Sequence, residues 1–189
     1  MSLHRAAVIA VGIALCISFD VLALADQVSD AQKAVQAVYD KRNAAATARD
    51  PKGVLVDCTP DFVYITKEGQ KGNLGVLKKR LIPLMSMAQN LKVTTARQTF
   101  TLKGREATST VKTHLECTFV GLDPQKPSKL ILDDTSEDVW IKTSKGWMQR
   151  RKKSIFDVTK LDGKVVNTTI DLTKDPVPPK SVKLSGQKR

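Results

Sequence analysis

The chain has 189 residues, 41% of them hydrophobic, and a formal net charge of +12 at pH 7. This length predicts one domain with a terminal extension, and the apolar content excludes an intrinsically disordered chain. The positive charge favours an acidic partner, for example an anionic small molecule, while a solvated basic protein with no polyanionic partner is the alternative.

Residues 1–25 have the pattern of an export signal. A short basic region precedes an apolar run over residues 6–17, and Ala23-Leu24-Ala25 is an A-x-A cleavage site. Asp20 interrupts the apolar stretch, which argues against a stable membrane span. We therefore expect cleavage after Ala25 and a periplasmic or secreted chain, with a retained N-terminal anchor as the alternative.

The segment from Val28 to Ala48 is predicted to be a helix. Ser29 and Gln32 have the spacing of a capping box at its start. One face should cover a sheet, since these residues recur at helical spacing: Val28, Ala31, Val35, Val38, Tyr39, Arg42, Ala45 and Ala46. The hydroxyl of Tyr39 either ends in a cavity or is satisfied within the core.

Two shorter helices and a short strand are expected next. A helix with Asp50 as its N-cap should run to about Cys58, and a strand should cover residues 61–66. A third helix is predicted over residues 74–82, where Pro83 should break or kink it.

Long β-segments are predicted after these helices. Strands are expected over residues 92–103 and 106–121, then from Leu130 into a hairpin over residues 136–156 whose last strand ends near Asp157. In the second strand, the alternation places Val111, Leu115, Cys117 and Phe119 on one face and Lys112, His114 and Glu116 on the other. This pattern is typical of a sheet with one buried face.

Residues 158–189 are predicted to form a basic C-terminal extension. Its first part, residues 164–172, favours an edge strand. Prolines and charges beyond Asp175 indicate disorder.

Cleavage would leave two cysteines, Cys58 and Cys117. An oxidising compartment permits a disulfide between them, and two small buried thiols are the alternative. The remaining histidine, His114, has no neighbouring metal-ligand spacing, so neither a metal site nor a cofactor is expected.

Helices followed by strands imply an α+β protein with its N-terminal helices packed on a curved antiparallel sheet. The order resembles the nuclear transport factor 2-like superfamily, which includes SnoaL-like cyclases and ketosteroid isomerases. Three stretches carry the resemblance: VQAVYDKRNAAATARDPKGVLVDCTPDFVYI, KGNLGVLKKRL and EDVWIKTSKGWMQRRKKS. It covers roughly residues 28–157, which implies a cystatin-like cone with a central pocket over residues 26–157.

The resemblance implies catalytic positions that this chain fills only in part. Asp138 falls where the isomerases have their proton-donating acid. Their base position is Thr66 here, and threonine is no base near neutral pH. Their helix tyrosine aligns near Arg42, with Tyr39 about one turn earlier. Isomerase chemistry is therefore disfavoured.

A basic run in the last hairpin suggests an anionic ligand. On a regular strand Arg151 and Lys153 face one side while Arg150 and Lys152 face the other, so one pair can reach the pocket mouth. No interleaved aromatics or groove-binding helix accompany the run, which argues against nucleic acid.

These observations predict an exported, dimeric binding module whose pocket takes a small hydrophobic or anionic molecule. Its pocket residues are expected to be Tyr39, Tyr64, Asp138, Trp140 and Arg151. The alternatives are a SnoaL or ketosteroid-isomerase type enzyme that uses Asp138 as an acid on a hydrophobic substrate, and an interaction domain with a filled pocket.

Overall fold

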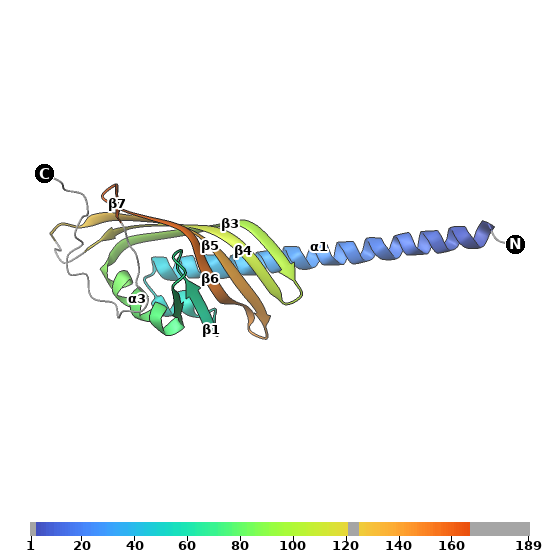
Figure 1. Cartoon of the computed structure of the whole chain (residues 1–189), viewed down its shortest axis with the longest axis horizontal. Helices are drawn as coiled ribbons and strands as arrows, with labels where there is room; N and C mark the ends of the chain where they lie inside the picture. The colour runs from blue at the N-terminus through green and yellow to red at the C-terminus, as the bar shows by residue number, and fades with distance from the viewer. Residues whose placement is uncertain (1–2, 121–124, 167–189) are drawn as a thin grey trace.

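The computed structural model describes residues 3–120 and 125–166, with side chains from Ala25 onward, and has helices followed by long strands (Figure 1). In chain order the elements are α1 (Leu3–Thr47), α2 (Pro51–Leu55), β1 (Cys58–Ile65), β2 (Lys71–Asn73), α3 (Leu74–Met87), β3 (Ala88–Lys103), β4 (Glu106–Phe119), β5 (Ser128–Thr143), β6 (Gly146–Leu161) and β7 (Lys164–Val166). The predicted α+β class is confirmed.

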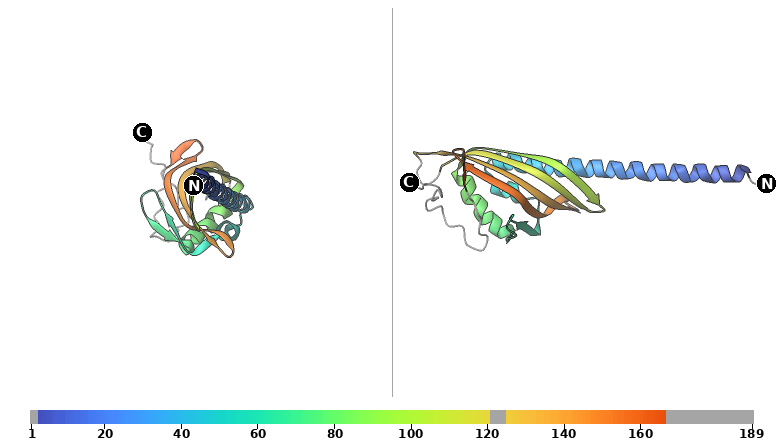
Figure 2. Two further views of the ribbon diagram at one scale, coloured as in Figure 1. Left: turned by 90° about the vertical axis from the view of Figure 1, so that its right-hand side faces the viewer. Right: turned by 45° about the horizontal axis from the view of Figure 1, so that its top comes forward.

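The strands form one curved, unclosed sheet. Its order is β2-β1-β6-β5-β4-β3, and β7 pairs with the far end of β6. Neighbouring strands are antiparallel except β1 and β6, which run parallel, so the sheet is mixed and not wholly antiparallel as predicted. Strands β3 to β6 curve around the C-terminal half of α1, and α3 lies on the same side of the sheet (Figures 1 and 2).

Helix α1 is longer than predicted. It begins at Leu3 and not at Val28, and its N-terminal half extends away from the sheet (Figure 1). Its C-terminal half buries Ala31, Val35 and Tyr39 on the face predicted from helical spacing. Within the described residues, no helix is both long enough and apolar enough to cross a membrane.

Side-chain caps start the two shorter helices. The Asp50 carboxylate accepts a hydrogen bond from the Lys52 amide, as expected, and the Asn73 side chain accepts one from the Val76 amide. Of the break or kink predicted at Pro83, a break does not occur, because α3 continues through Pro83 to Met87.

Several strand limits differ from those predicted. Strand β1 already begins at Cys58, where the second helix was expected to end. Strand β6 continues beyond Asp157 to Leu161, and the edge strand β7 covers only residues 164–166 among those described. The segment beyond Asp175, predicted to be disordered, lies outside the described residues.

Two clusters of buried side chains lie under the sheet. One joins α1 to the end of the sheet where the β5–β6 hairpin turns; it consists of Ala31, Val35, Tyr39, Ala107, Val111, Trp140 and Trp147. The other joins α1 and α3 to β3 and β4, and it consists of Ala46, Met85, Ala88, Leu91 and Cys117. Apart from Tyr39, the first cluster does not line the cavity described below and is called the filled cluster, whereas all five residues of the second line that cavity.

Two bulges interrupt the alternation of side chains along β6. Arg150 has no pairing partner between Gln149 and Arg151, and Ile155 has none between its neighbours in the β5–β6 ladder. At each bulge two consecutive residues point away from the core, so the inward positions become Gln149, Lys152, Ser154, Asp157 and Thr159. These bulges decide which basic residue enters the cavity.

Candidate ligand-binding cavity

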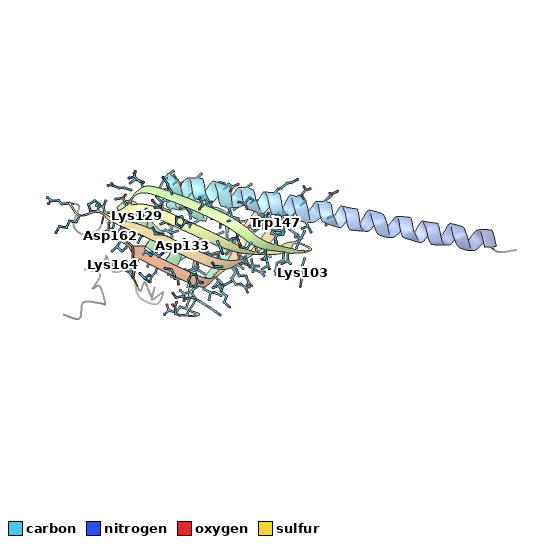
Figure 3. All side chains as sticks on the ribbon, turned by 90° about the horizontal axis from the view of Figure 1, so that it is seen from above. Lys103, Lys129, Asp133, Trp147, Asp162 and Lys164 are labelled. Atoms are coloured by element: carbon cyan, nitrogen blue, oxygen red, sulfur yellow. The ribbon has the colours of Figure 1, made fainter. Side chains whose placement is uncertain are left out.

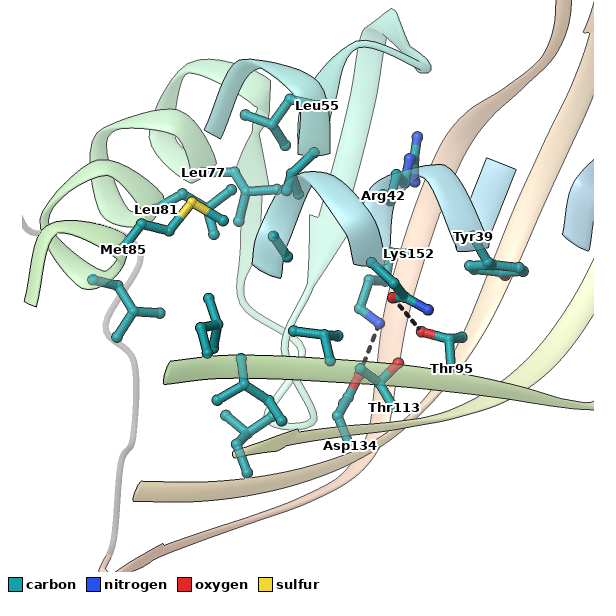
Figure 4. A pocket seen from close by; sticks show the side chains of 18 of the residues that line it. Tyr39, Arg42, Leu55, Leu77, Leu81, Met85, Thr95, Thr113, Asp134 and Lys152 are labelled. Carbon is teal, nitrogen blue, oxygen red and sulfur yellow. Dashed lines mark hydrogen bonds and ion pairs between the residues drawn. The ribbon is translucent and has the colours of Figure 1, made fainter. Parts of the chain in front are cut away.

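A cavity of about 320 Å³ lies between the concave face of the sheet and the helices. This volume is at the small end of the range of pockets that hold small molecules. One part is apolar, and its lining includes Leu77, Leu81, Leu84, Met85, Leu91, Leu115, Leu130 and Leu132. In the close-up, the side chains from α3 stand on one side and the polar side chains of α1, β5 and β6 on the other (Figure 4).

The polar part is built around the carboxyl group of Asp138, which is 1% exposed. The Tyr39 hydroxyl donates to its Oδ2 over 2.6 Å, and the Ser136 hydroxyl donates to its Oδ1 over 3.2 Å. Tyr39 Oη also lies 3.0 Å from Ser109 Oγ, which accepts from the Trp140 indole. The Asp138 carboxyl is therefore held by side chains from a helix and its own strand.

Lys152 continues this network across β5 and β6. Its ammonium group donates to Asp134 Oδ2 over 2.8 Å and to Ser136 Oγ over 2.7 Å (Figure 4). Ser154 donates to the second oxygen of Asp134 over 2.7 Å. Each member of this ion pair thus has a second partner, which a half-buried pair requires.

Arg42 lines the same cavity from α1. Its guanidinium donates to the side-chain oxygen of Gln149 and, over 3.4 Å, to Cys58 Sγ. The same group lies over the Trp140 ring, 5.3 Å from its centroid. Its Nε is buried without a hydrogen-bond partner among the described residues.

The environment changes the proton affinity of the network. Burial raises the pKa of the Asp138 carboxyl, although Lys152, Tyr39, Ser136 and the charge of Arg42 act in the opposite direction. Burial, followed by the charge of Asp138, raises the pKa of Tyr39. For Lys152, burial acts to lower the pKa, but the charges of Asp138 and Asp134 outweigh it and the pKa is raised.

Three of the five predicted pocket residues line the cavity: Tyr39, Tyr64 and Asp138. Trp140 is fully buried behind it and meets the Tyr39 ring edge to face, with centroids 5.1 Å apart. Arg151 was placed wrongly, because it is exposed and pairs with Glu137 on the outside of the sheet. The bulge at Arg150 turns Arg151 outward and brings Lys152 inward.

The polar lining includes residues that were not predicted as pocket residues, among them Arg42, Asp134 and Gln149, and it includes Lys152 from one of the two basic pairs left open. The inward position of Asp134 could have been predicted from that of Asp138, because positions 134, 136 and 138 share a face on a regular strand. Arg42 lies on the predicted apolar face of α1. No sequence signal marked the β6 bulges, so the sequence could not decide between the pair containing Lys152 and the pair containing Arg151.

Other candidate residues lie away from the cavity. Thr66 does not line it; its hydroxyl accepts from the Gln70 amide in the turn after β1. His114 is exposed, as predicted, with Nδ1 2.7 Å from Asp133 Oδ1. Asp133 lies on the outer face of the sheet (Figure 3), whereas Asp134 lines the cavity.

Cys58 and Cys117 are both free, buried thiols, so the predicted possibility of a disulfide is not realised. They line the cavity from β1 and β4, which are separated in the sheet by β6 and β5. Three strand spacings of about 4.8 Å along the sheet exceed the separation that a disulfide spans. Burial raises the pKa of both thiols.

The described residues contain no group of three or more histidine, cysteine, aspartate and glutamate side chains that could hold a metal ion. The polar part of the cavity offers instead hydroxyl, carboxyl, ammonium and guanidinium groups. These groups can donate or accept hydrogen bonds to one end of a bound molecule, and Asp138 can carry a proton.

Comparison with known proteins identifies the fold. No family model and no curated protein matches the sequence. One similar solved structure is a nuclear transport factor 2-like protein with a cystatin-like fold from Novosphingobium aromaticivorans, with a TM-score of 0.53 and 12% identity over 70% of this chain and 86% of that chain. A second is a nuclear transport factor 2-like superfamily protein from Salmonella enterica, with a TM-score of 0.55 and 13% identity over 67% of this chain and 90% of that chain. A third is a protein proposed to be a scytalone dehydratase from Novosphingobium aromaticivorans, with a TM-score of 0.57 and 12% identity over 67% of this chain and 85% of that chain. The chain has the cystatin-like fold of the nuclear transport factor 2-like superfamily.

Proposed function

We propose that this protein binds a small, largely apolar molecule in the cavity between the sheet and helices α1 and α3. The observation that carries the proposal is the lining of the cavity, which combines a leucine-rich part with a few converging polar groups. Binding sites for small molecules commonly have this composition, because apolar contact supplies affinity and the polar groups fix orientation.

Filling the apolar part should weaken binding, and 1-octanol is a suitable neutral probe. Ala46 on α1 is buried and lines the cavity, so Ala46→Leu adds side-chain volume where the octyl chain would lie. We expect calorimetric titration to show affinity reduced about tenfold or more, a loss of about 1.4 kcal/mol. Ala37→Leu, on an exposed position of the same helix, is the matched control.

Equal octanol binding by the wild type and Ala46→Leu would contradict the location of the site. If the wild type binds no octanol and purifies without a small molecule, the proposed binding function is rejected in favour of the alternative, an interaction domain that binds no small molecule.

Catalysis on a hydrophobic substrate is a second candidate. The buried Asp138 carboxyl with its raised pKa is a potential proton donor within the cavity. Thr66, at the position of the isomerase base, lies outside the cavity, which weighs against an isomerase mechanism. Turnover that Asp138→Asn abolishes, while octanol binding persists, would favour the enzyme.

Export and dimer formation are further proposals, and they rest on the sequence pattern of residues 1–25 and on the resemblance to the superfamily. Intact-mass measurement of the protein from its native source should give a chain beginning at Asp26. Native mass spectrometry of the same sample should give twice that mass. A chain that keeps residues 1–25, or a monomer at micromolar concentration, would contradict the respective proposal.

A further inference from the structure

The cationic groups of the cavity differ in how they are neutralised. Lys152 forms an ion pair with Asp134 within the cavity. Arg42 has only uncharged side chains as hydrogen-bond partners among the described residues, namely Gln149 and Cys58. The positive charge of Arg42 therefore lies in the cavity without a carboxylate in contact.

The acidic groups of the cavity are already engaged. Asp134 accepts from Lys152 and Ser154, and Asp157 forms an ion pair with Lys67. The remaining acid, Asp138, is completely buried and accepts from Tyr39 and Ser136 rather than from Arg42. Burial raises the pKa of the Asp138 carboxyl, and Arg42 acts on this carboxyl through its charge and not through a hydrogen bond.

The guanidinium is also held in place before any ligand binds. Its central carbon lies over the Trp140 ring, and two of its nitrogen atoms donate to Gln149 and Cys58. Its buried Nε has no acceptor among the described residues. A planar cation with unused donors matches the two oxygens of a carboxylate, and little side-chain entropy is lost when both are bound.

We infer that the ligand of this cavity is an anionic amphiphile, a monocarboxylic acid with a compact apolar body, whose carboxylate is bound by Arg42. This inference rests on the proposed binding function and specifies the ligand class. The leucine-rich part of the cavity would hold the apolar body, while Lys152 would remain paired with Asp134.

Three probes with the same chain and different head groups test the inference: octanoate, 1-octanol and octylammonium. At pH 7.5 we expect the wild type to bind octanoate about tenfold or more tightly than octanol, and octylammonium most weakly. Arg42→Gln should remove the preference for octanoate, so that the affinities for octanoate and octanol come within about twofold of each other. A melting temperature and circular dichroism spectrum like those of the wild type demonstrate that the variant is folded.

Lys41→Gln is the matched control, because it removes the same charge from the neighbouring position of α1. Lys41 does not line the cavity and pairs with Asp57 at the surface. This variant should keep the preference for octanoate. Arg42→Lys, which keeps the charge without the planar fork, should retain only part of it.

The other outcomes overturn the inference in distinguishable ways. Equal affinity of the wild type for octanoate and octanol would reject the anionic ligand while preserving the proposed binding function. A preference that survives Arg42→Gln but is lost in Lys152→Met would assign the head group to Lys152. Absence of binding by all three probes would reject both the inference and the proposed function.

Discussion

The carboxyl group of Asp138 illustrates how a few residues create a chemical environment that no single residue provides. It combines complete burial with hydrogen bonds from Tyr39 and Ser136 and the nearby charge of Lys152. Burial is the largest influence, so the protonated form is favoured more in the native protein than in the unfolded chain. This difference links the stability of the fold to pH.

Asp138→Asn should change the pH dependence of stability. Because the native pKa is raised, the wild type loses stability as pH rises from about 4, the unfolded value, through the native pKa. Asparagine does not titrate, so the variant should lack this loss. Its unfolding free energy relative to the wild type should therefore increase with pH between about 4 and 8. The raised pKa of Lys152 gives a stabilisation lost only above its unfolded value of about 10.4, outside this window.

Urea denaturation at a series of pH values measures this difference. Asp61→Asn, which neutralises an exposed carboxylate, controls for a change in net charge. Parallel pH profiles for the wild type and Asp138→Asn would contradict the assignment of a raised native pKa.

At the level of elements, strand β6 separates what the sequence could predict from what it could not. The helical face of α1 and the alternation in β4 follow regular periods, so Tyr39 and Cys117 were placed correctly on inward faces. The bulges depend on how β6 pairs with β5, which is a tertiary property without a local signal. That is why Arg151 was placed inward instead of Lys152.

Deleting a bulge residue should cost less than deleting a paired one. Without Arg150, Gln149 and Lys152 keep their inward positions, and an exposed ion pair with Glu106 is lost. Such a pair contributes about 1 kcal/mol or less. Lys153 lies opposite Glu137 in the β5–β6 ladder, so deleting it forces Lys152 or the buried Ser154 to the opposite face of the sheet.

Thermal unfolding of the two deletion variants compares these costs. We expect the variant without Lys153 to melt at the lower temperature, since it disturbs buried hydrogen bonds of Asp134. A larger effect from deleting Arg150 would contradict the role of the bulge.

The order of the strands also predicts the state of the cysteines. Cys58 lies on β1 and Cys117 on β4, with two strands between them. We therefore expect the intact mass of the protein to be the same with and without a reductant. A mass increase on reduction would require a bridge, and hence a different arrangement of these strands.

At the level of the whole molecule, α1 joins the described core through its C-terminal half. Ala25, Asp26 and Gln27 are exposed, and Ala31 is the first residue in a buried cluster. The cone is closed by the C-terminal half of α1, from which Tyr39 and Arg42 reach the cavity. Stability should therefore depend on α1 only from about residue 28 onward.

A chain that begins at Asp26 should melt at the same temperature as the full chain within about 2 °C, a difference of less than 1 kcal/mol. A chain that begins at Gln36 loses Ala31 and Val35 from the filled cluster and should be destabilised by several degrees, or about 2–4 kcal/mol. Circular dichroism during heating measures both. Equal melting temperatures for the two shortened chains would contradict this account.

The two buried clusters differ in what substitutions they tolerate over evolutionary time. Apart from Tyr39, the residues of the filled cluster around Trp140 and Trp147 do not line the cavity, so they are constrained by the requirement to fold. Residues such as Leu81 and Leu115 line the cavity, and their side chains can change size with less penalty. Descendants of this gene would therefore change ligand preference mainly through the leucine-rich lining of the cavity, while the filled cluster at the β5–β6 hairpin preserved the fold.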